Sequence, residues 1–294
     1  MKNHKKWKKV KKYRFVYLVL IPILLYFLIF SYGPLIMGIV QSFQKIKLSG
    51  RKEFVGLDNY ERVINDDGFI QAIQNSLFIG LFKWGLVFIC SLILALSINE
   101  LSNRRMKKFI QTTTYLPYLL SWTVVGGIWI FLLSPKGLIN NLFVHGRSPI
   151  LFMTKKELGP WIMILTGVWK EIGYYALLFL ASIVSINPNI FEAAQIDNAS
   201  RIKQIHRLIL PELRPTMKTL LILSIMGLFT NFDQLFVMGN PAIISVIRSP
   251  ILYIYENGIQ KFDIGLATAA SAIVLILTFI VTMTLRYFLY RNEE

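Results

Sequence analysis

The chain has 294 residues, of which 54% are hydrophobic and only 16% are charged. Soluble globular chains carry about 25% charged residues, so this composition argues against an ordinary cytosolic enzyme. The 32 Lys and Arg residues outnumber the 16 Asp and Glu and give a net charge of +16, which on a polar chain would suggest nucleic-acid binding. On so apolar a chain, the same excess predicts a membrane protein whose basic residues gather in loops on one side.

Six apolar stretches are long enough to cross a hydrocarbon core about 30 Å thick, which takes about 20 helical residues. The first follows a basic segment, as in a signal peptide, but it exceeds the roughly 7–15 apolar residues of a signal sequence and no small-residue cleavage site follows it. We therefore expect it to be an uncleaved first span. The predicted fold is all-α, a polytopic membrane protein with about six transmembrane helices, over residues 15–40, 75–98, 109–133, 161–184, 216–238 and 265–289.

The distribution of Lys and Arg orients these predicted spans. Six spans place both termini on one side, and that side holds 19 of the 32 basic residues against 11 in the opposite loops. We therefore expect the termini in the cytoplasm, with a basic cytoplasmic tail at 1–14 and a six-span domain at 15–294. The lysines of the tail would attract anionic membrane lipid at about 1 kcal/mol each, and we expect no nucleic-acid partner.

The longest loop predicted on the cytoplasmic side contains two short helices. The first is predicted to start at Asn187, before a proline, or at Asn189, with a glutamate three residues on as a capping partner. We expect it to stop at Asn198, because Asn tolerates positive φ better than most residues. A second helix is predicted over 199–210, ended by Pro211. Such a helical knob at the membrane surface could dock either on lipid or on a protein.

This loop resembles the EAA loop of permease subunits of binding-protein-dependent ABC importers. The family pattern is Glu-Ala-Ala, a glycine after three more residues, and later Ile-x-Leu-Pro. In this chain residues 192–194 read Glu-Ala-Ala, Asn198 stands in place of the glycine, and 209–211 read Ile-Leu-Pro. The predicted six spans with both ends inside match the family as well, so the resemblance covers essentially the whole chain, and the cytoplasmic coupling loop corresponds to residues 187–213.

Four further stretches are similar to sugar-importer permeases. Residues 56–60 read Gly-Leu-Asp-Asn-Tyr, an element common among them. Asn-Phe-Asp-Gln at 231–234, Asn-Pro at 240–241 and Gly-Leu-Ala-Thr-Ala at 265–269 resemble the branch that imports oligosaccharides and polysaccharides.

The resemblance implies a permease subunit of an ATP-driven importer that moves sugars, oligosaccharides in particular, from an extracellular binding protein into the cytoplasm. The partners it implies are a second permease in a heterodimeric pore, two cytosolic ATPase subunits and a solute-binding protein such as a lipoprotein. It implies that Glu192 contacts a basic group of the ATPase and that the alanines pack in its cleft. The implied coupling residues are Glu192, Ala193, Ala194, Asp197, Asn198 and Pro211.

The chain has no phosphate-binding GxxxxGK[ST] motif, so we expect it to be no enzyme and to bind no cofactor, with ATP and Mg held by the partner ATPase. Its one cysteine and three histidines are scattered, so we also expect no metal site. An alternative is an ion-coupled secondary carrier or channel for a small polar solute, which would need no ATPase.

Lys83, Lys170, Glu171 and Asp233 lie within or near the predicted spans. A charge at the centre of a bilayer costs about 2.5–3.5 kcal/mol, so each of these should face protein or water. Lys170 and Glu171 are neighbours in sequence and do not face each other on a helix, so each needs its own partner. Two roles stay open for these charged residues: they form ion pairs between helices, or they line a substrate path.

Sugars are bound by aromatic faces combined with hydrogen-bonding groups, although aromatic residues in spans also serve as packing and interfacial belts. The candidate substrate-pathway residues are Trp169, Lys170, Glu171, Tyr174, Tyr175, Asn231, Asp233 and Gln234.

Overall fold

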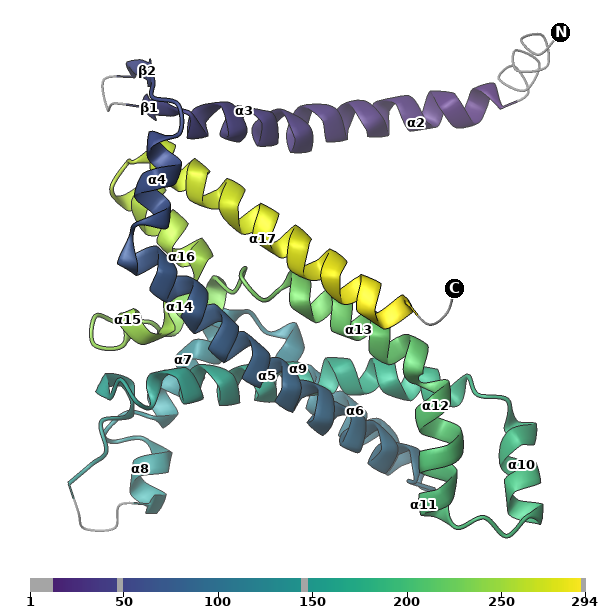
Figure 1. The fold of residues 1–294 in the computed structure, drawn as a ribbon. Coiled ribbons are helices and arrows are strands. Elements are labelled where there is room, and N and C mark those ends of the chain that lie inside the picture. Colours follow the sequence, from purple (N-terminus) through teal and green to yellow (C-terminus); the bar gives the residue numbers. More distant parts are fainter. Residues whose placement is uncertain (1–12, 47–49, 144–147, 292–294) are drawn as a thin grey trace, which may run out of the picture. The chain divides into compact units, whose positions relative to one another are not determined.

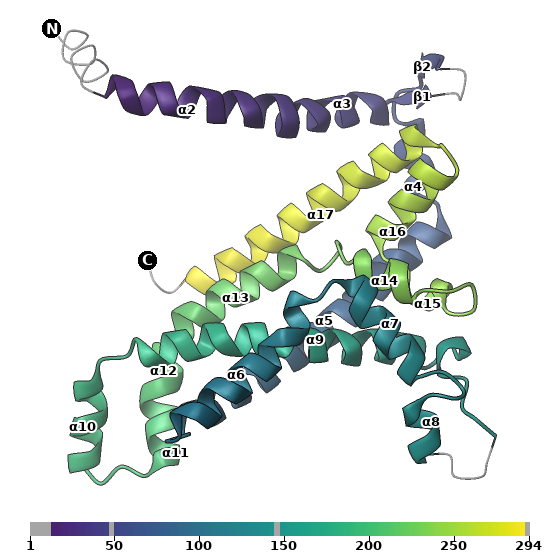
Figure 2. The same ribbon diagram turned by 180° about the vertical axis from the view of Figure 1, so that it is seen from behind.

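The computed structural model describes residues 13–46, 50–143 and 148–291 (Figures 1 and 2). The chain divides into two compact units, residues 1–63 with 257–272 and residues 64–256 with 273–294. In the described part of the chain the two strands form one antiparallel hairpin, and nearly everything else that is regular is helix. The predicted all-α class is confirmed.

The first unit begins with one long apolar helix. α2 (Arg14–Phe27), the π-helical turn η1 (Leu28–Tyr32) and α3 (Gly33–Ser42) run on into one another and form a 29-residue candidate span, in agreement with the predicted stretch 15–40. The wider η1 turn ends at Tyr32, two residues before Pro34, whose ring would clash with the carbonyl four residues earlier in a regular α-helix.

A hairpin and a short helix follow in the same unit. β1 (Gln44–Ile46) pairs with β2 (Lys52–Phe54), with Lys45 opposite Glu53. The turn into α4 (Asp58–Ile64) has φ +57° at Gly56, a conformation that glycine adopts without the steric cost of a Cβ.

Asn59 joins three parts of this first unit. Its side chain is buried, and Nδ2 donates to the carbonyl oxygens of Ser42 at 2.9 Å and Gln44 at 3.0 Å. The same Gln44 carbonyl lies so close to Gly265, at the start of α17 (Ile264–Tyr290), that a Cβ there would collide with it. The Gly-Leu-Asp-Asn-Tyr element is therefore a structural junction between the end of α3, the hairpin and the start of α17.

The second unit holds the other helices (Figure 1). In chain order they are α5 (Asp67–Asn99), α6 (Arg104–Leu119), α7 (Trp122–Leu132), α8 (Leu138–Phe143), the 3₁₀ turn η2 (Phe152–Thr154), α9 (Gly159–Val184), α10 (Pro188–Ile196), α11 (Arg201–Gln204), the π turn η3 (Ile205–Ile209), α12 (Leu210–Glu212), α13 (Arg214–Met226), α14 (Asp233–Met238), α15 (Ile244–Ile247), α16 (Pro250–Tyr255), the π turn η4 (Glu256–Gln260), which passes into the first unit, and the later part of α17.

Helix α9 is the centre of the second unit, because it packs along both α5 and α6. Its contact with α6 is closest at Gly173, where a Cβ would collide with the backbone carbonyl of Thr114. A glycine at this position lets the two helix backbones approach, as small residues do at membrane helix contacts.

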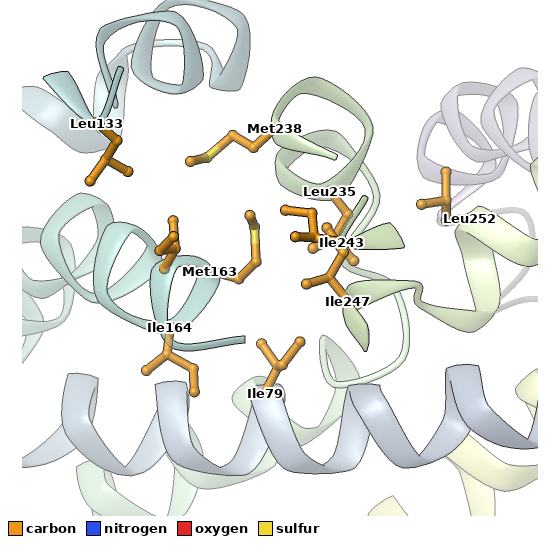
Figure 3. Packing of buried hydrophobic residues seen from close by; sticks show 10 residues of the cluster. Ile79, Leu133, Met163, Ile164, Leu235, Met238, Ile243, Ile247 and Leu252 are labelled. Atoms are coloured by element: carbon orange, nitrogen blue, oxygen red, sulfur yellow. The ribbon is translucent and has the colours of Figure 1, made fainter. Parts of the chain in front are cut away.

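Two apolar clusters lie at the two ends of α9. One combines Ile79 of α5, Met163 and Ile164 of α9, and residues of α14, α15 and α16 (Figure 3). The other is built around Phe179 and Ile183 of α9, against the end of α5, η3 and α13. The region of α9 between the clusters carries its two charged residues, Lys170 and Glu171.

Two of the six predicted spans are not single helices, which corrects the sequence-based expectation. Four described helices are long and apolar enough to cross a membrane, or five if α6 and α7 count as one broken span. The stretch 109–133 bends by 100° between α6 and α7, where Leu120 is extended and the Ser121 hydroxyl caps α7.

The stretch 216–238 is interrupted between Met226 and Asp233. Gly227, Thr230 and Asn231 in this gap have low helix propensity. In addition, the Ser249 hydroxyl donates to the Asn231 carbonyl at 2.7 Å and so replaces a helical hydrogen bond there.

Replacing Gly173 with Ala should lower the free energy of unfolding by about 1–3 kcal/mol, the usual cost of forcing extra volume into a packed contact. Thermal unfolding in detergent would measure the change. Gly85→Ala is the matched control, because a Cβ there meets nothing within 4 Å; alanine should be neutral or stabilising in that helix interior. Equal unfolding temperatures for the two variants would contradict the proposed close contact.

Candidate functional site

A cavity of about 350 Å³ lies within the second unit. Its walls come from α5, the bend between α6 and α7, α9, and the broken stretch from α13 to α14. It combines aromatic rings with charged and hydroxyl groups, so it is suited to a polar organic molecule. Six of the eight candidate pathway residues line it: Lys170, Glu171, Tyr174, Tyr175, Asn231 and Asp233.

Lys170 points from α9 to the end of α6. Its side chain is buried, with the residue 7% exposed. The ammonium donates to the backbone carbonyls of Pro117 at 3.1 Å, Tyr118 at 2.9 Å and Leu120 at 2.7 Å. It also lies 5.4 Å from the centre of the Tyr118 ring and 5.6 Å from that of Trp122, within the range of a cation–π interaction.

Glu171 faces the opposite wall of the cavity. Its Oε1 accepts a hydrogen bond from Nζ of Lys83 on α5 at 2.8 Å, and both side chains are about four-fifths buried. The prediction that Lys170 and Glu171 have separate partners is confirmed. Lys83 is one of the charges that the sequence places within a span, and the ion pair joins α5 to α9 in the lining of the cavity.

Three tyrosines form one side of the cavity. The rings of Tyr118 and Tyr174 stack at 4.2 Å with an angle of 6° between their planes, and Tyr174 meets Tyr175 edge to face. The Tyr175 hydroxyl lies 3.3 Å from that of Ser224. Sequence reasoning missed Tyr118, Trp84 and Trp122 as lining residues, because nothing in the sequence distinguishes them from the other aromatic residues of the spans.

Asp233 opens α14 at the edge of the cavity. Its side chain is exposed and lines the cavity, and among the described residues its carboxylate has no ion pair or hydrogen bond. A carboxylate in the first turn of a helix is favourably placed relative to the helix dipole. Because it lines the cavity without such a partner, this carboxylate can accept hydrogen bonds from a molecule in the cavity.

The other two candidate pathway residues lie away from the cavity lining. Trp169 is 41% exposed and packs edge to face against Trp129 at 5.5 Å. Gln234 is fully buried, and its Nε2 donates to the Met163 carbonyl at 2.7 Å and to the Thr166 hydroxyl at 2.9 Å. Gln234 thus braces α14 against α9.

The loop that follows α9 begins with a well-capped helix. The Asn187 side chain accepts from the backbone N–H of Asn189 at 3.0 Å, so of the two possible starts for α10 the structure selects Asn187 as N-cap. At the other end Asn198 has φ +50°, as predicted. The N–H of Asn198 donates to the Gln195 carbonyl and that of Ala199 to the Ala194 carbonyl, which is the Schellman arrangement that usually uses glycine.

The second helix of the loop differs from the prediction. It is helical from Arg201 through η3 to Glu212, so Pro211 lies inside it and does not end it. As with Pro34 in the first unit, a π turn precedes the proline and widens the helix where the ring would clash.

The two helices expose both acidic and apolar groups. Glu192, Ala193 and Asp197 are exposed, whereas Ala194 is buried. Two large apolar side chains also face outward, with Ile196 82% and Ile202 71% exposed. Exposed apolar groups beside charges are typical of a docking surface.

Arg201 connects this loop to the end of α5. Its guanidinium binds both carboxylate oxygens of Glu100, through Nε at 2.8 Å and Nη2 at 2.5 Å. It also donates to Gln204, whose amide donates to the Ala199 carbonyl. This bidentate geometry fixes the orientation of the start of α11.

The sequence matches a family of transport proteins. The family described as "Binding-protein-dependent transport system inner membrane component" matches residues 87–292. The polygalacturonan/rhamnogalacturonan transport system permease protein YteP of Bacillus subtilis (strain 168) is 31% identical over 270 residues, which cover 90% of this chain and 84% of YteP. The arabinooligosaccharides transport system permease protein AraP of the same strain is 31% identical over 91% of this chain and 86% of AraP.

The chain is also similar in structure to chains of solved transporters. A chain of a bacterial ABC transporter involved in the import of the acidic polysaccharide alginate superposes with a TM-score of 0.90 at 30% identity, covering 99% of this chain and 100% of that one. The alginate transporter in complex with its alginate pentasaccharide-bound periplasmic protein gives a TM-score of 0.88 at 30% identity, with 97% of each chain covered.

Lys83→Met should destabilise the protein by about 3 kcal/mol, because it leaves the Glu171 carboxylate buried without its partner. The double variant Lys83→Met/Glu171→Gln removes both charges and should recover most of that loss. Thermal unfolding of the two single variants and the double variant gives the coupling as a double-mutant cycle. Additive effects of the two changes would contradict a direct ion pair.

Proposed function

Since the chain belongs to the family of binding-protein-dependent transport system inner membrane components, we propose that it is the permease subunit of an ATP-driven importer of oligosaccharides. Two relatives are named for the transport of polygalacturonan/rhamnogalacturonan and of arabinooligosaccharides, and a structural neighbour belongs to a transporter involved in the import of alginate. These matches favour an ABC importer over an ion-coupled secondary carrier.

The observation that carries the sugar assignment on this chain itself is the cavity. Sugars are held by aromatic faces that pack against the ring C–H groups and by polar groups that bind the hydroxyls. The cavity offers the Tyr118–Tyr174 stack beside Asn231 and the free carboxylate of Asp233. Trp169 and Gln234 complete the proposed pathway set, although they lie outside the lining; Gln234 accepts a hydrogen bond from the lining residue Asn231 at 3.0 Å.

In the proposed importer the loop 187–213 docks on a cytosolic ATPase subunit. Glu192 is exposed to meet a basic group, and the neighbouring alanines leave room for a close approach. Asn198 holds the turn between the two helices, and Asp197 and Pro211 belong to the same coupling segment. The partners proposed are a second permease, two ATPase subunits that bind ATP and Mg, and an extracellular binding protein.

The topology follows from this docking. If the loop 187–213 meets a cytosolic ATPase, that side is the cytoplasm, and the excess of Lys and Arg on the same side agrees with the positive-inside rule. We propose that the basic tail at 1–14, of which residues 1–12 lie outside the described part of the chain, is on the cytoplasmic side, as is the C-terminus. We also propose that residues 15–294 form the permease domain in the plasma membrane.

Deleting the gene should abolish uptake of one class of labelled oligosaccharide and leave uptake of monosaccharides unchanged. The panel should include neutral arabinooligosaccharides and acidic uronic-acid oligosaccharides. Reintroduction of the gene is the control, and depletion of ATP should stop uptake in the complemented strain. Uptake by the purified chain in proteoliposomes driven by an ion gradient alone would contradict the proposal and favour a secondary carrier.

Glu192→Arg should reduce co-purification of the ATPase, and with it uptake, by at least about tenfold, the effect of losing about 1.4 kcal/mol of binding free energy. The change places like charges in contact at the docking surface. Glu157→Arg is the matched control, since Glu157 is also exposed but lies in the loop before α9. Unchanged co-purification of the Glu192→Arg variant would show that Glu192 is not at the interface.

A further inference from the structure

We propose that Lys170 is a positioning residue, which holds the bend between α6 and α7 onto α9 and does not itself bind the cargo. A lysine ammonium has three N–H donors. All three are matched by the backbone carbonyls of Pro117, Tyr118 and Leu120, at 2.7–3.1 Å. No donor of Lys170 is left for a hydroxyl group in the cavity.

The carbonyl groups at the bend between α6 and α7 need a hydrogen-bond donor from another helix. The last carbonyl groups of a helix have no intrahelical donors, and in an apolar environment each unsatisfied group is costly. The Pro117 carbonyl also accepts from the backbone N–H of Leu120 at 3.3 Å, so the need for a donor is greatest at Tyr118 and Leu120. α6 ends at Leu119 in a stretch with no room for a further turn, because Leu120 is extended and α7 starts at Trp122 at an angle of 100°. A buried cation at a helix C-terminus also interacts favourably with the helix dipole.

The ammonium contacts both sides of the bend. Tyr118 belongs to α6 and Trp122 to α7, and the rings of both lie near Nζ. Gly173, almost one turn further along α9, allows the α6 backbone to approach closely enough for Lys170 to reach these carbonyls. One side chain of α9 therefore fixes the position of two helices.

The contact of Lys170 with the bend, here called the tie, has a consequence for transport. This consequence rests on the proposed function. The bend carries Tyr118 and Trp122 into the cavity wall, and α9 leads directly into the proposed coupling loop. With Lys170 in place, a displacement of α9 carries the bend with it. The groups left to recognise cargo are then the tyrosines, Asn231, Asp233 and the free oxygen of Glu171.

Spin labels on α7 and α9 test the tie without any cargo or ATPase. Both Val124 and Leu165 are exposed, so Val124→Cys and Leu165→Cys in a Cys90→Ala background provide a labelled pair in the full chain in nanodiscs. The parent should give one narrow distance distribution. Lys170→Met should broaden it, whereas Lys170→Arg, which keeps a cation and several donors, should leave it narrow.

The matched control is the double variant Lys83→Met/Glu171→Gln, which removes the other ammonium of the cavity wall. It should keep the narrow distribution. A narrow, unchanged distribution in Lys170→Met would overturn the proposal, and so would a broad one in the parent.

Uptake kinetics supply a second measurement that does not depend on recovering Lys170→Met. Lys170→Arg should leave both the maximal rate of uptake and the KM for the cargo close to those of the parent, because the bend stays in place and the residue does not contact the cargo. A raised KM with an unchanged distance distribution would show that Lys170 contacts the cargo instead. Since the distance measurement requires no transport, failure of the proposed tie can be distinguished from failure of the proposed function.

Discussion

The structure of the second unit depends on one constraint: each backbone carbonyl group that a broken helix leaves without a partner needs a hydrogen-bond donor. Inside an apolar layer there is no water to bind them, so every break requires a donor from elsewhere in the chain. The structure supplies these donors from polar side chains on neighbouring helices. Examples are Lys170 to the end of α6, Ser249 to Asn231, and Asn75 to Ser245 and Arg248.

This constraint changes how polar residues in apolar stretches should be interpreted. From the sequence, a charged or amide side chain in a span indicates either a structural bond or a substrate path. The requirement for separate partners of Lys170 and Glu171 was predictable, because neighbouring residues of a helix point in different directions. Their identities were not, since one partner is a side chain of α5 and the other is a set of backbone carbonyls at a bend.

The long continuous helices were predictable because their apolar length leaves few alternatives, and α9 and α17 match their predicted bounds within a few residues. The turn at Asn198 was also predictable, since few residues other than glycine tolerate its φ. The breaks were not, because hydropathy averaged over about 20 residues hides a gap such as the one after Met226. Nor was the passage of the helix through Pro211, where a π turn removes the clash that would otherwise end it.

The second unit also explains how a displacement of the loop would reach the cavity under the proposed function. The loop is joined covalently to α9, which carries Lys170 and Glu171, and to α5 through the Arg201–Glu100 ion pair. Both side chains of that pair are more than 40% exposed, and exposed pairs contribute only about 0–1 kcal/mol. α9 and the bend tied to it should therefore follow the loop more closely than α5 does. The Lys83–Glu171 pair spans these two walls, so a relative movement between them must stretch or break it first.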